Sequence, residues 1–455
     1  MGKGGDLARG PVMARKGKDI AAPARREGGV TLREVKQHDS ADDCWLVIKG
    51  SVYDVTGWKH PGGKVIHSHA GRDATDAFAA WHNADAWAML ERFKVGPLAQ
   101  EAQDDADTPL LRDFRALRVQ ARRQGLFKSN KLFYAWKVAS TLALCVGAAA
   151  VALQGGRALS WAAYLASAAL MGLFFQQSGW LAHDFLHNQV FDSSLLNECV
   201  GYMVGNVWQG FSVAWWKNKH NYHHAACNEI GDDGDAVDPD IDTIPLLAWD
   251  ERMLGQLDPA SSLQRFIIRN QAALFFPLLS FAKFTWNYSS MMDVHLAGST
   301  RSAAALAVEV AGLTAHYVWT AALAIKAFGP TMAALGYFAL SNIAGGLLVA
   351  FVFVQSHNGK EVHAFAEKGK DWLRMQVETT RNQPGSLLNN WFSGGLNMQI
   401  EHHLFPTMPR HSLPKMVAMV KQLCAKHGIV YEECGWIEST RRVLAHLSAI
   451  SLKLE

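Results

Sequence analysis

The histidines of this chain gather in short groups whose spacing suits metal binding. The groups are His183 with His187, His220 with His223 and His224, and Gln399 with His402 and His403, while His357 stands alone. Residues three or four positions apart share one face of a helix, so each group is predicted to present its side chains from one helical face. Imidazole nitrogen is a ligand for iron, copper, zinc and nickel. All nine residues are therefore predicted to be metal ligands.

The number of histidines indicates more than one ion. Eight imidazoles exceed the coordination shell of a single ion and suit two. Soluble di-iron bundles rely on carboxylates, and the acidic run at 229–242 offers some, but glycine and proline interrupt it. We interpret that run as a solvated loop or a support around the ligands. Asp184 and Glu401 lie inside the histidine motifs and are expected to orient a ligand histidine through its other ring nitrogen.

A separate motif near the N-terminus predicts a haem. The sequence His-Pro-Gly-Gly at 60–63 forms a tight turn that lets the backbone approach a flat cofactor while His60 points at its centre. His82, between an aromatic residue and Asn83, is the expected partner on the opposite wall, with His67 and His69 as alternatives. Two axial imidazoles leave the iron no open position, so such a haem carries electrons.

The elements around this motif predict a small α+β domain at 30–98. The β-rich runs 44–48 and 51–55 are separated by Lys49 and Gly50, which is a hairpin signal, and helix-like stretches follow. Residues 1–29 are basic and rich in glycine and alanine without an apolar core, so we expect a disordered leader and no secretory signal. Residues 99–131 are expected to be a linker and pre-membrane segment.

The rest of the chain predicts an all-α integral membrane domain at 132–440, with a tail at 441–455. Four stretches carry few charges and are each long enough to cross about 30 Å of hydrocarbon: 132–153, 158–178, 303–324 and 332–353. We expect four spans in two hairpins, with six as the alternative. The apolar stretches 199–216 and 266–288 contain polar residues and are expected to be interfacial, beneath a cytosolic helical cap.

This topology brings the histidines together. If the N-terminal domain is cytosolic, four spans deliver every histidine group to the same membrane face, and basic residues at 112–131 flank that face. Glu309 and His316 lie seven positions apart inside the third span. Intramembrane ionisable groups are functional candidates, but a hydrogen-bonded pair that stabilises the bundle is an equal alternative, and neither belongs to the predicted metal set.

The overall composition gives no support for a nucleic-acid-binding protein or for a disulfide-stabilised domain. The chain has 455 residues with 44 Lys and Arg against 41 Asp and Glu, a net charge of +3, which gives no bulk argument for nucleic acid as a partner. Its six cysteines are scattered without a CxxC pair, so a disulfide framework is not expected.

These motifs carry a family resemblance. Residues 30–98 resemble cytochrome b5, and 30–440 as a whole resemble the membrane front-end fatty acyl desaturases with a fused cytochrome b5 domain. The marks are His-Pro-Gly-Gly at 60–63, HX3H at 183–187, HX2HH at 220–224, and a third box that begins with Gln399 in place of histidine. One departure is Asn188, where many relatives have a further histidine.

The resemblance implies that a non-haem di-iron centre and O2 remove two hydrogens from a fatty acyl chain, with electrons from the fused haem b. It also implies NADH–cytochrome b5 reductase as the electron source, an acyl-CoA or a phospholipid-bound acyl chain as substrate, and the endoplasmic reticulum membrane, with both sites on the cytosolic face. A substrate tunnel is expected between the spans, with candidate lining residues Trp208, Gln209, Trp215 and Trp216.

The motifs look closest to algal and fungal Δ6 enzymes, so we expect Δ6 desaturation of linoleoyl and α-linolenoyl chains. Δ5 or Δ8 fatty acyl desaturation and sphingoid-base desaturation are alternatives. A sterol or acyl hydroxylase would use the same histidines. A membrane-anchored cytochrome b5 electron carrier would explain only 30–98.

Overall fold

The computed structural model describes Pro23, Arg26 and residues 28–60, 62–99, 108–155, 160–296, 302–364 and 371–454. Most of the expected leader at 1–29 therefore lies outside the described residues, as does the acidic part of the expected linker at 100–107.

A four-stranded sheet frames the N-terminal domain. Its order is β3-β1-β2-β4, with β1 at Trp45–Ile48, β2 at Ser51–Asp54, β3 at Arg72–Asp73 and β4 at Lys94–Pro97. Lys49 and Gly50 join β1 to β2 and both have positive φ, 49° and 68°, which is the type I′ hairpin turn that matches strand twist. The expected hairpin is present.

Alternation along the strands separates two apolar cores. Leu46 and Ile48 of β1 face a cavity, whereas Trp45 and Val47 pack on the opposite side of the sheet, as the two-residue period of a strand requires. Short helices surround the cavity: η1 Gly63–His69, α2 Thr75–Trp81, α3 Ala84–Leu90 and η2 Glu91–Phe93. The helix α1 Leu32–Val35 packs on the opposite side of the sheet.

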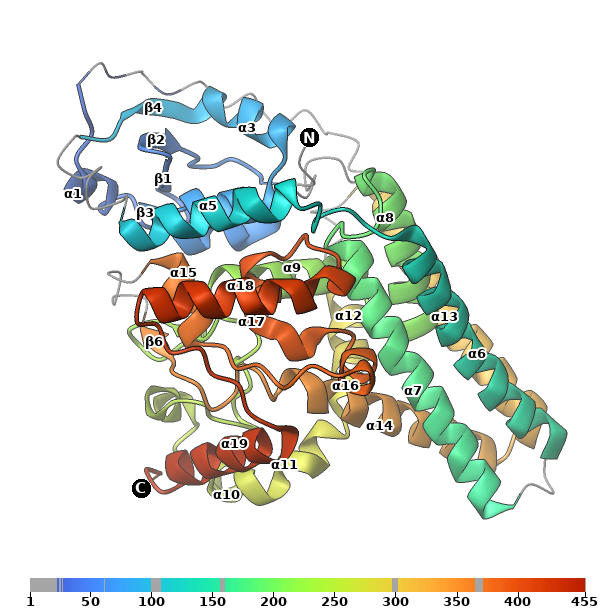
Figure 1. Ribbon diagram of the computed structural model, residues 1–455. Helices are drawn as coiled ribbons and strands as arrows, with labels where there is room; N and C mark the ends of the chain where they lie inside the picture. Colours follow the sequence, from blue (N-terminus) through green and yellow to red (C-terminus); the bar gives the residue numbers. More distant parts are fainter. Residues whose placement is uncertain are drawn as a thin grey trace.

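Among the described residues, three helices are long and apolar enough to cross a membrane: α6 Lys131–Gly155, α13 Ala303–Phe328 and α14 Met332–Phe353. The other expected span, 158–178, lies largely in α7 Trp161–Leu186, which is not among them, so the count of four is not confirmed. α7 lies against α6 and α14 (Figure 1), and every residue from 174 to 186 is buried. Because its neighbours cover it, α7 carries Gln176, Gln177 and a histidine motif without exposing them.

The two stretches expected at the interface are each divided into short helices. The first becomes α8 Ser194–Tyr202, the π-helical η4 Met203–Gln209 and α9 Val213–Ala225; the second becomes α10 Ser262–Arg269, α11 Gln271–Leu279 and α12 Ala282–Leu296. Gly210, with φ +91°, separates η4 from α9. A Cβ atom on residue 210 would lie 2.5 Å from the ring of His316. Glycine alone fits that close approach.

Glu309 and His316 of α13 each bind this irregular segment and not one another. Glu309 accepts hydrogen bonds from Asn206 Nδ2 at 2.7 Å and from the backbone N–H of Ala214 at 2.9 Å. His316 Nδ1 donates to the carbonyl of Val207 at 3.1 Å. Both residues thereby fix the segment that leads into α9.

The remaining elements form a cap over the polar end of the bundle. They are α5 Pro109–Arg123, β5 Glu229–Ile230 paired with β6 His363–Ala364, η5 Glu251–Gln256, α15 Trp372–Glu378, α16 Leu387–Phe392, η7 Leu396–Met398, α17 Gln399–Leu404, η8 Arg410–Ser412, α18 Leu413–Lys426 and α19 Trp436–Ser451. In Figure 1, α5 is the part of the cap that lies between the strands of the N-terminal domain and α18.

The N-terminal domain is packed directly onto the cap. Ala77, Ala80 and Trp81 of α2 belong to the same continuous core as Phe114 of α5 and Ile400 of α17. Buried ion pairs add to this contact. Asp76 binds Arg115 at 2.9 Å and Arg118 at 3.0 Å, and Arg72 binds Glu229 through two hydrogen bonds of 2.8 and 3.2 Å.

We expect Asp76→Asn to destabilise the protein by about 3 kcal/mol, because it leaves the buried guanidinium of Arg118 without its counter-charge. Chemical denaturation in detergent, followed by circular dichroism, measures the change. The control Glu91→Gln removes an exposed partner of Lys94 and should cost less than about 0.5 kcal/mol. Equal shifts in the two variants would contradict a structural role for the buried pair.

Candidate metal centre and haem cavity

The expected ligands divide into two neighbouring groups. The first group consists of His183, His187, His220, His224 and His402, and their ligand atoms all lie within 4.8 Å of one another. α7, α9 and α17 supply four of these side chains, and His187 is the C-cap residue of α7. His183 and His402 meet through their Nε2 atoms at 3.0 Å although they are 219 positions apart.

The ring nitrogens of the first group fit a bound cation. Successive Nε2 atoms are separated by 2.9–3.1 Å along the path His183, His402, His224, His220, His187. A single Nε2 hydrogen serves one neighbour, so hydrogen bonding within the group cannot satisfy all of these contacts. A metal ion attracts every lone pair at once, and imidazole is a suitable ligand for iron.

The second group consists of His223, His357 and His403 with Gln399. The ring centroids of the three histidines lie 4.5–5.0 Å apart. The Gln399 side-chain amide nitrogen lies 3.1 Å from His357 Nε2 and 3.3 Å from His403 Nε2, while its Oε1 is buried and makes no hydrogen bond to a described residue. The residue that replaces histidine in the third box therefore faces the same point as the second group.

Hydrogen bonds fix the second group in the orientation that a metal requires. Nδ1 of His223 donates to Asp238 at 2.8 Å, Nδ1 of His403 to Gln376 Oε1 at 2.6 Å, and Nδ1 of His357 to the carbonyl of Thr379 at 3.2 Å. In His357 and His403 the hydrogen on Nδ1 leaves Nε2 with its lone pair, and in His223 the hydrogen bond to Asp238 holds the ring in a fixed orientation. Such partners orient ligands and raise their basicity.

Burial holds most of these imidazoles neutral. Loss of solvation, reinforced by neighbouring rings, lowers the pKa of His220, His224, His357 and His403 well below the ordinary value, and that of His402 to about 3. His223 differs. Burial lowers its pKa, but Asp238 and Asp240 more than offset burial and raise it to about 9. Neutral imidazoles are the form that binds metal.

The two carboxylates expected to orient ligands behave differently. Asp184 lies 3.4 Å from His183 Nδ1, and it also forms a buried ion pair with Arg410. The prediction for Glu401 was wrong. Glu401 accepts hydrogen bonds from Asn382 at 2.8 Å and Tyr431 at 2.9 Å, because adjacent residues on a helix point about 100° apart. The acidic run supplies the support instead, through Asp238.

The expected tunnel residues lie beside the first group and in the bundle. Trp216 stacks on His220 with ring centroids 4.3 Å apart and covers the first group. Trp208 packs on Phe174, and Trp215 on Trp286. Neither polar atom of the buried Gln209 amide is hydrogen-bonded to a described residue.

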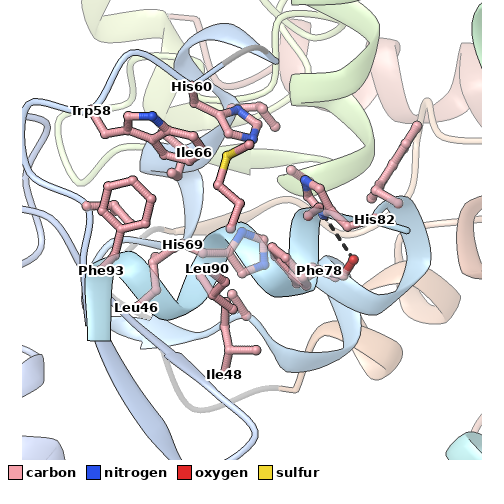
Figure 2. A pocket seen from close by; sticks show the side chains of 18 of the residues that line it. Leu46, Ile48, Trp58, His60, Ile66, His69, Phe78, His82, Leu90 and Phe93 are labelled. Atoms are coloured by element: carbon pink, nitrogen blue, oxygen red, sulfur yellow. Dashed lines mark hydrogen bonds between the residues drawn. The ribbon is translucent and has the colours of Figure 1, made fainter. Parts of the chain in front are cut away.

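A second site lies in the N-terminal domain, between His60 and His82 (Figure 2). The two ring centroids are 5.9 Å apart across an apolar cavity of about 100 Å³. Leu46, Phe78 and Phe93 contribute to its walls. A Cβ on Gly62 would meet the His60 ring at 2.7 Å, so glycine at this position is needed for that ring's placement.

The donor set suits a haem iron. His82 Nδ1 donates to the carbonyl of Phe78 at 3.0 Å, which leaves its Nε2 free for a metal. Burial, reinforced by His82, lowers the pKa of His60 to about 3, and burial lowers the pKa of His82 to about 4. Both rings are therefore neutral at pH 7. His69 also lines the cavity, and its Nδ1 is hydrogen-bonded to Ser68 at 2.9 Å.

Three residues at these sites were missed in the sequence. Gln376 and Trp81 belong to no histidine motif, and the only local signal for Trp81 is its position next to His82. Cys227 lies 3.2 Å from His357 Nδ1, on the opposite edge of the ring from Gln399. Burial raises the pKa of Cys227 well above its ordinary value, and its sulfur lies within 4.8 Å of the ligand atoms of His223, His357 and His403.

Comparisons with known proteins identify two families in this chain. The fatty acid desaturase family matches residues 159–435, and the cytochrome b5-like haem/steroid binding domain matches residues 31–99. The chain is 42% identical to an acyl-lipid (9-3)-desaturase of Physcomitrium patens, over 95% of this chain and 82% of that protein. It is 34% identical to a Delta(8)-fatty-acid desaturase of Euglena gracilis, over 85% and 90%. It is also 33% identical to a Delta(5) fatty acid desaturase of Caenorhabditis elegans, over 88% and 93%.

Replacing His82 by alanine should abolish haem binding, because the cavity loses one of its two facing imidazoles, whereas His67→Ala should retain haem. The ratio of Soret to protein absorbance measures haem binding.

Acid should also release haem. The unfolded chain binds protons on these histidines near pH 6.5 and the folded chain only near 3–4, so the stability they confer falls as the pH drops through that window. Full haem occupancy in His82→Ala would remove His82 from the site.

Asp238→Asn should weaken metal binding at the second group by about 10–100-fold, because His223 loses the acceptor that orients it. Iron per haem, measured by elemental analysis after dialysis against a weak chelator, reports the loss. The control Asp233→Asn changes an exposed carboxylate of the same loop and should leave the iron content unchanged. If Asp238→Asn retains as much iron as the control, the orienting role is excluded.

Proposed function

The chain belongs to the fatty acid desaturase family and carries a fused cytochrome b5-like domain, and we propose that it introduces a double bond at carbon 6 of linoleoyl and α-linolenoyl chains. The cytochrome b5-like domain binds haem, and the family uses a di-iron centre with O2. The observation that carries the proposal is the convergence of two histidine groups beside a cavity with two facing imidazoles.

The overall reaction is balanced by an external reductant. A CH2–CH2 pair, O2, two electrons and two protons give CH=CH and two molecules of water. When bound, two irons supply the activated oxygen that can remove hydrogen from an unactivated carbon, which no acid or base achieves. The chain's own residues bind the ions, hold the ligand rings in place and exclude water.

Each histidine group has a distinct task in this proposal. His183, His187, His220, His224 and His402 hold one iron, and His223, His357 and His403 with Gln399 hold the other. Asp238 and Gln376 keep the Nδ1 hydrogens of their partners in place. Trp216, stacked on His220, shields the first group from water. An amide oxygen is a weaker ligand than imidazole, so Gln399 is expected to bind its ion less tightly than a histidine would.

The position of the new double bond is supported by one similarity in particular. The relative with 42% identity over 95% of this chain is an acyl-lipid (9-3)-desaturase, and 9 minus 3 corresponds to carbon 6. The relatives that act at carbons 8 and 5 are 34% and 33% identical. Desaturation at carbon 8 or 5 is the second candidate, favoured by those relatives.

The membrane arrangement follows from the same site. We propose that α7 crosses with α6 as a hairpin, and α13 with α14 as a second, which places all histidine groups at the cytosolic face of the endoplasmic reticulum. The acyl chain, on coenzyme A or phospholipid, enters between these helices. A NADH–cytochrome b5 reductase supplies electrons to the fused haem.

Yeast cells expressing the full chain should convert linoleic and α-linolenic acid to products with a new double bond at carbon 6. Gas chromatography with mass spectrometry of derivatised fatty acids locates the bond and distinguishes loss of two hydrogens from insertion of oxygen. A bond at carbon 8 or 5, formed from supplied C20 acids, would replace the carbon 6 assignment. A hydroxylated product would overturn desaturation.

The matched variants are His223→Ala and His295→Ala. The first removes a proposed ligand and should reduce the product below detection while the reduced-haem spectrum survives. The second changes an exposed histidine of α12 and should retain activity. Product formation by His223→Ala at the wild-type level would be incompatible with the proposed metal centre.

A further inference from the structure

One residue of the N-terminal domain touches both sites. Trp81 lines the cavity between His60 and His82, and its ring centroid lies 5.1 Å from that of His187 and 5.2 Å from that of His224. We propose that the indole of Trp81 is the path by which electrons pass from the haem to the first histidine group. This inference rests on the proposed function, since it takes the haem as donor and the iron as acceptor.

The contact is dense enough to carry electrons. Trp81 is 9% exposed and belongs to the core shared by α2 and the cap, so packed side chains surround the indole. Electron tunnelling decays exponentially with distance, and it decays more slowly through covalent bonds and packed atoms than through gaps. An indole that lines the cavity and contacts His187 and His224 therefore gives a faster path than a smaller side chain would.

Trp81 is also held in a fixed position relative to both ends of the path. It precedes His82, whose ring stacks on Phe78 at 4.0 Å and is hydrogen-bonded to the Phe78 carbonyl. At the start of the same helix, Asp76 is bound by Arg118 of α5. The donor domain is thus docked in a transfer geometry, and a diffusive search by a tethered domain is not needed.

A competing path exists along α9. Asn221 and Ala225 also line the cavity, and both are close in sequence to His224. That path runs through the helix backbone and involves no side chain of the N-terminal domain. Substitution of Trp81 therefore distinguishes the two paths.

The electron balance needs one outside reagent. For each electron that crosses Trp81, a ferrous haem becomes ferric and one ferric ion of the first group becomes ferrous, while the indole is left unchanged. Two such transfers provide the two electrons that each desaturation consumes. A flavin-dependent NADH reductase of the class proposed above restores the ferrous haem.

The test measures internal electron transfer directly. The full-length protein, with haem and iron bound in detergent, is reduced at the haem by a laser flash without O2, and reoxidation of the haem is followed at the Soret band. We expect Trp81→Leu to slow reoxidation several-fold and Trp81→Phe to lie between Trp81→Leu and the wild type. The matched control Trp87→Leu removes an indole that packs on Phe78 and should reoxidise at the wild-type rate.

Iron content, the haem spectrum and the haem midpoint potential are measured on each variant, and a purely structural role would change these and not the rate alone. A wild-type rate in both Trp81 variants overturns the proposal in favour of α9. If Trp81→Leu loses iron, the Trp81→Phe variant is used for the test. A wild-type rate of haem reoxidation in Trp81→Phe would then overturn the proposed path. If both variants lose iron, Trp81 assembles the site and the proposal fails. If wild-type haem is not reoxidised at all, the proposed function fails instead.

Discussion

The structure depends on crowding imidazole nitrogens to about 3 Å from one another in a buried space. The available ring hydrogens cannot satisfy all of these contacts, so lone pairs are left facing one another. A bound cation removes the conflict. The polar end of α7, the short helices α9 and α17, and the segment after α14 all converge on this point, although His183 and His402 are 219 positions apart.

The same constraint explains the polar residues around the site. A ligand ring must present Nε2 to the metal, so its Nδ1 must donate elsewhere. In the second group, Asp238, Gln376 and the carbonyl of Thr379 accept these hydrogens. Glu309 and His316 do not contact the ligand rings in this way. They stabilise the scaffold, because their hydrogen bonds fix the irregular turn that leads into α9.

Packing of the haem domain against the cap changes how electron delivery is understood. A fused donor already has a high effective concentration at its acceptor. Here α2 shares a core with α5 and α17, and two buried ion-pair sites join the domain to its surroundings. The two redox sites are consequently parts of one packed unit, with Trp81 between them.

The histidine spacing determined the helical faces, and the motif around His60 determined the α+β domain, because ligand geometry and hairpin chemistry are local properties. The grouping of His223 with His357 and Gln399, the support from Gln376 and the failure of Glu401 to reach a ligand were decided by tertiary structure, since they depend on how helices distant in sequence are rotated and packed. The interpretation of α7 as a membrane span shows the same difference between sequence and tertiary structure. The mean hydropathy of α7 depends on its composition alone, whereas the neighbouring helices decide which of its polar residues are exposed.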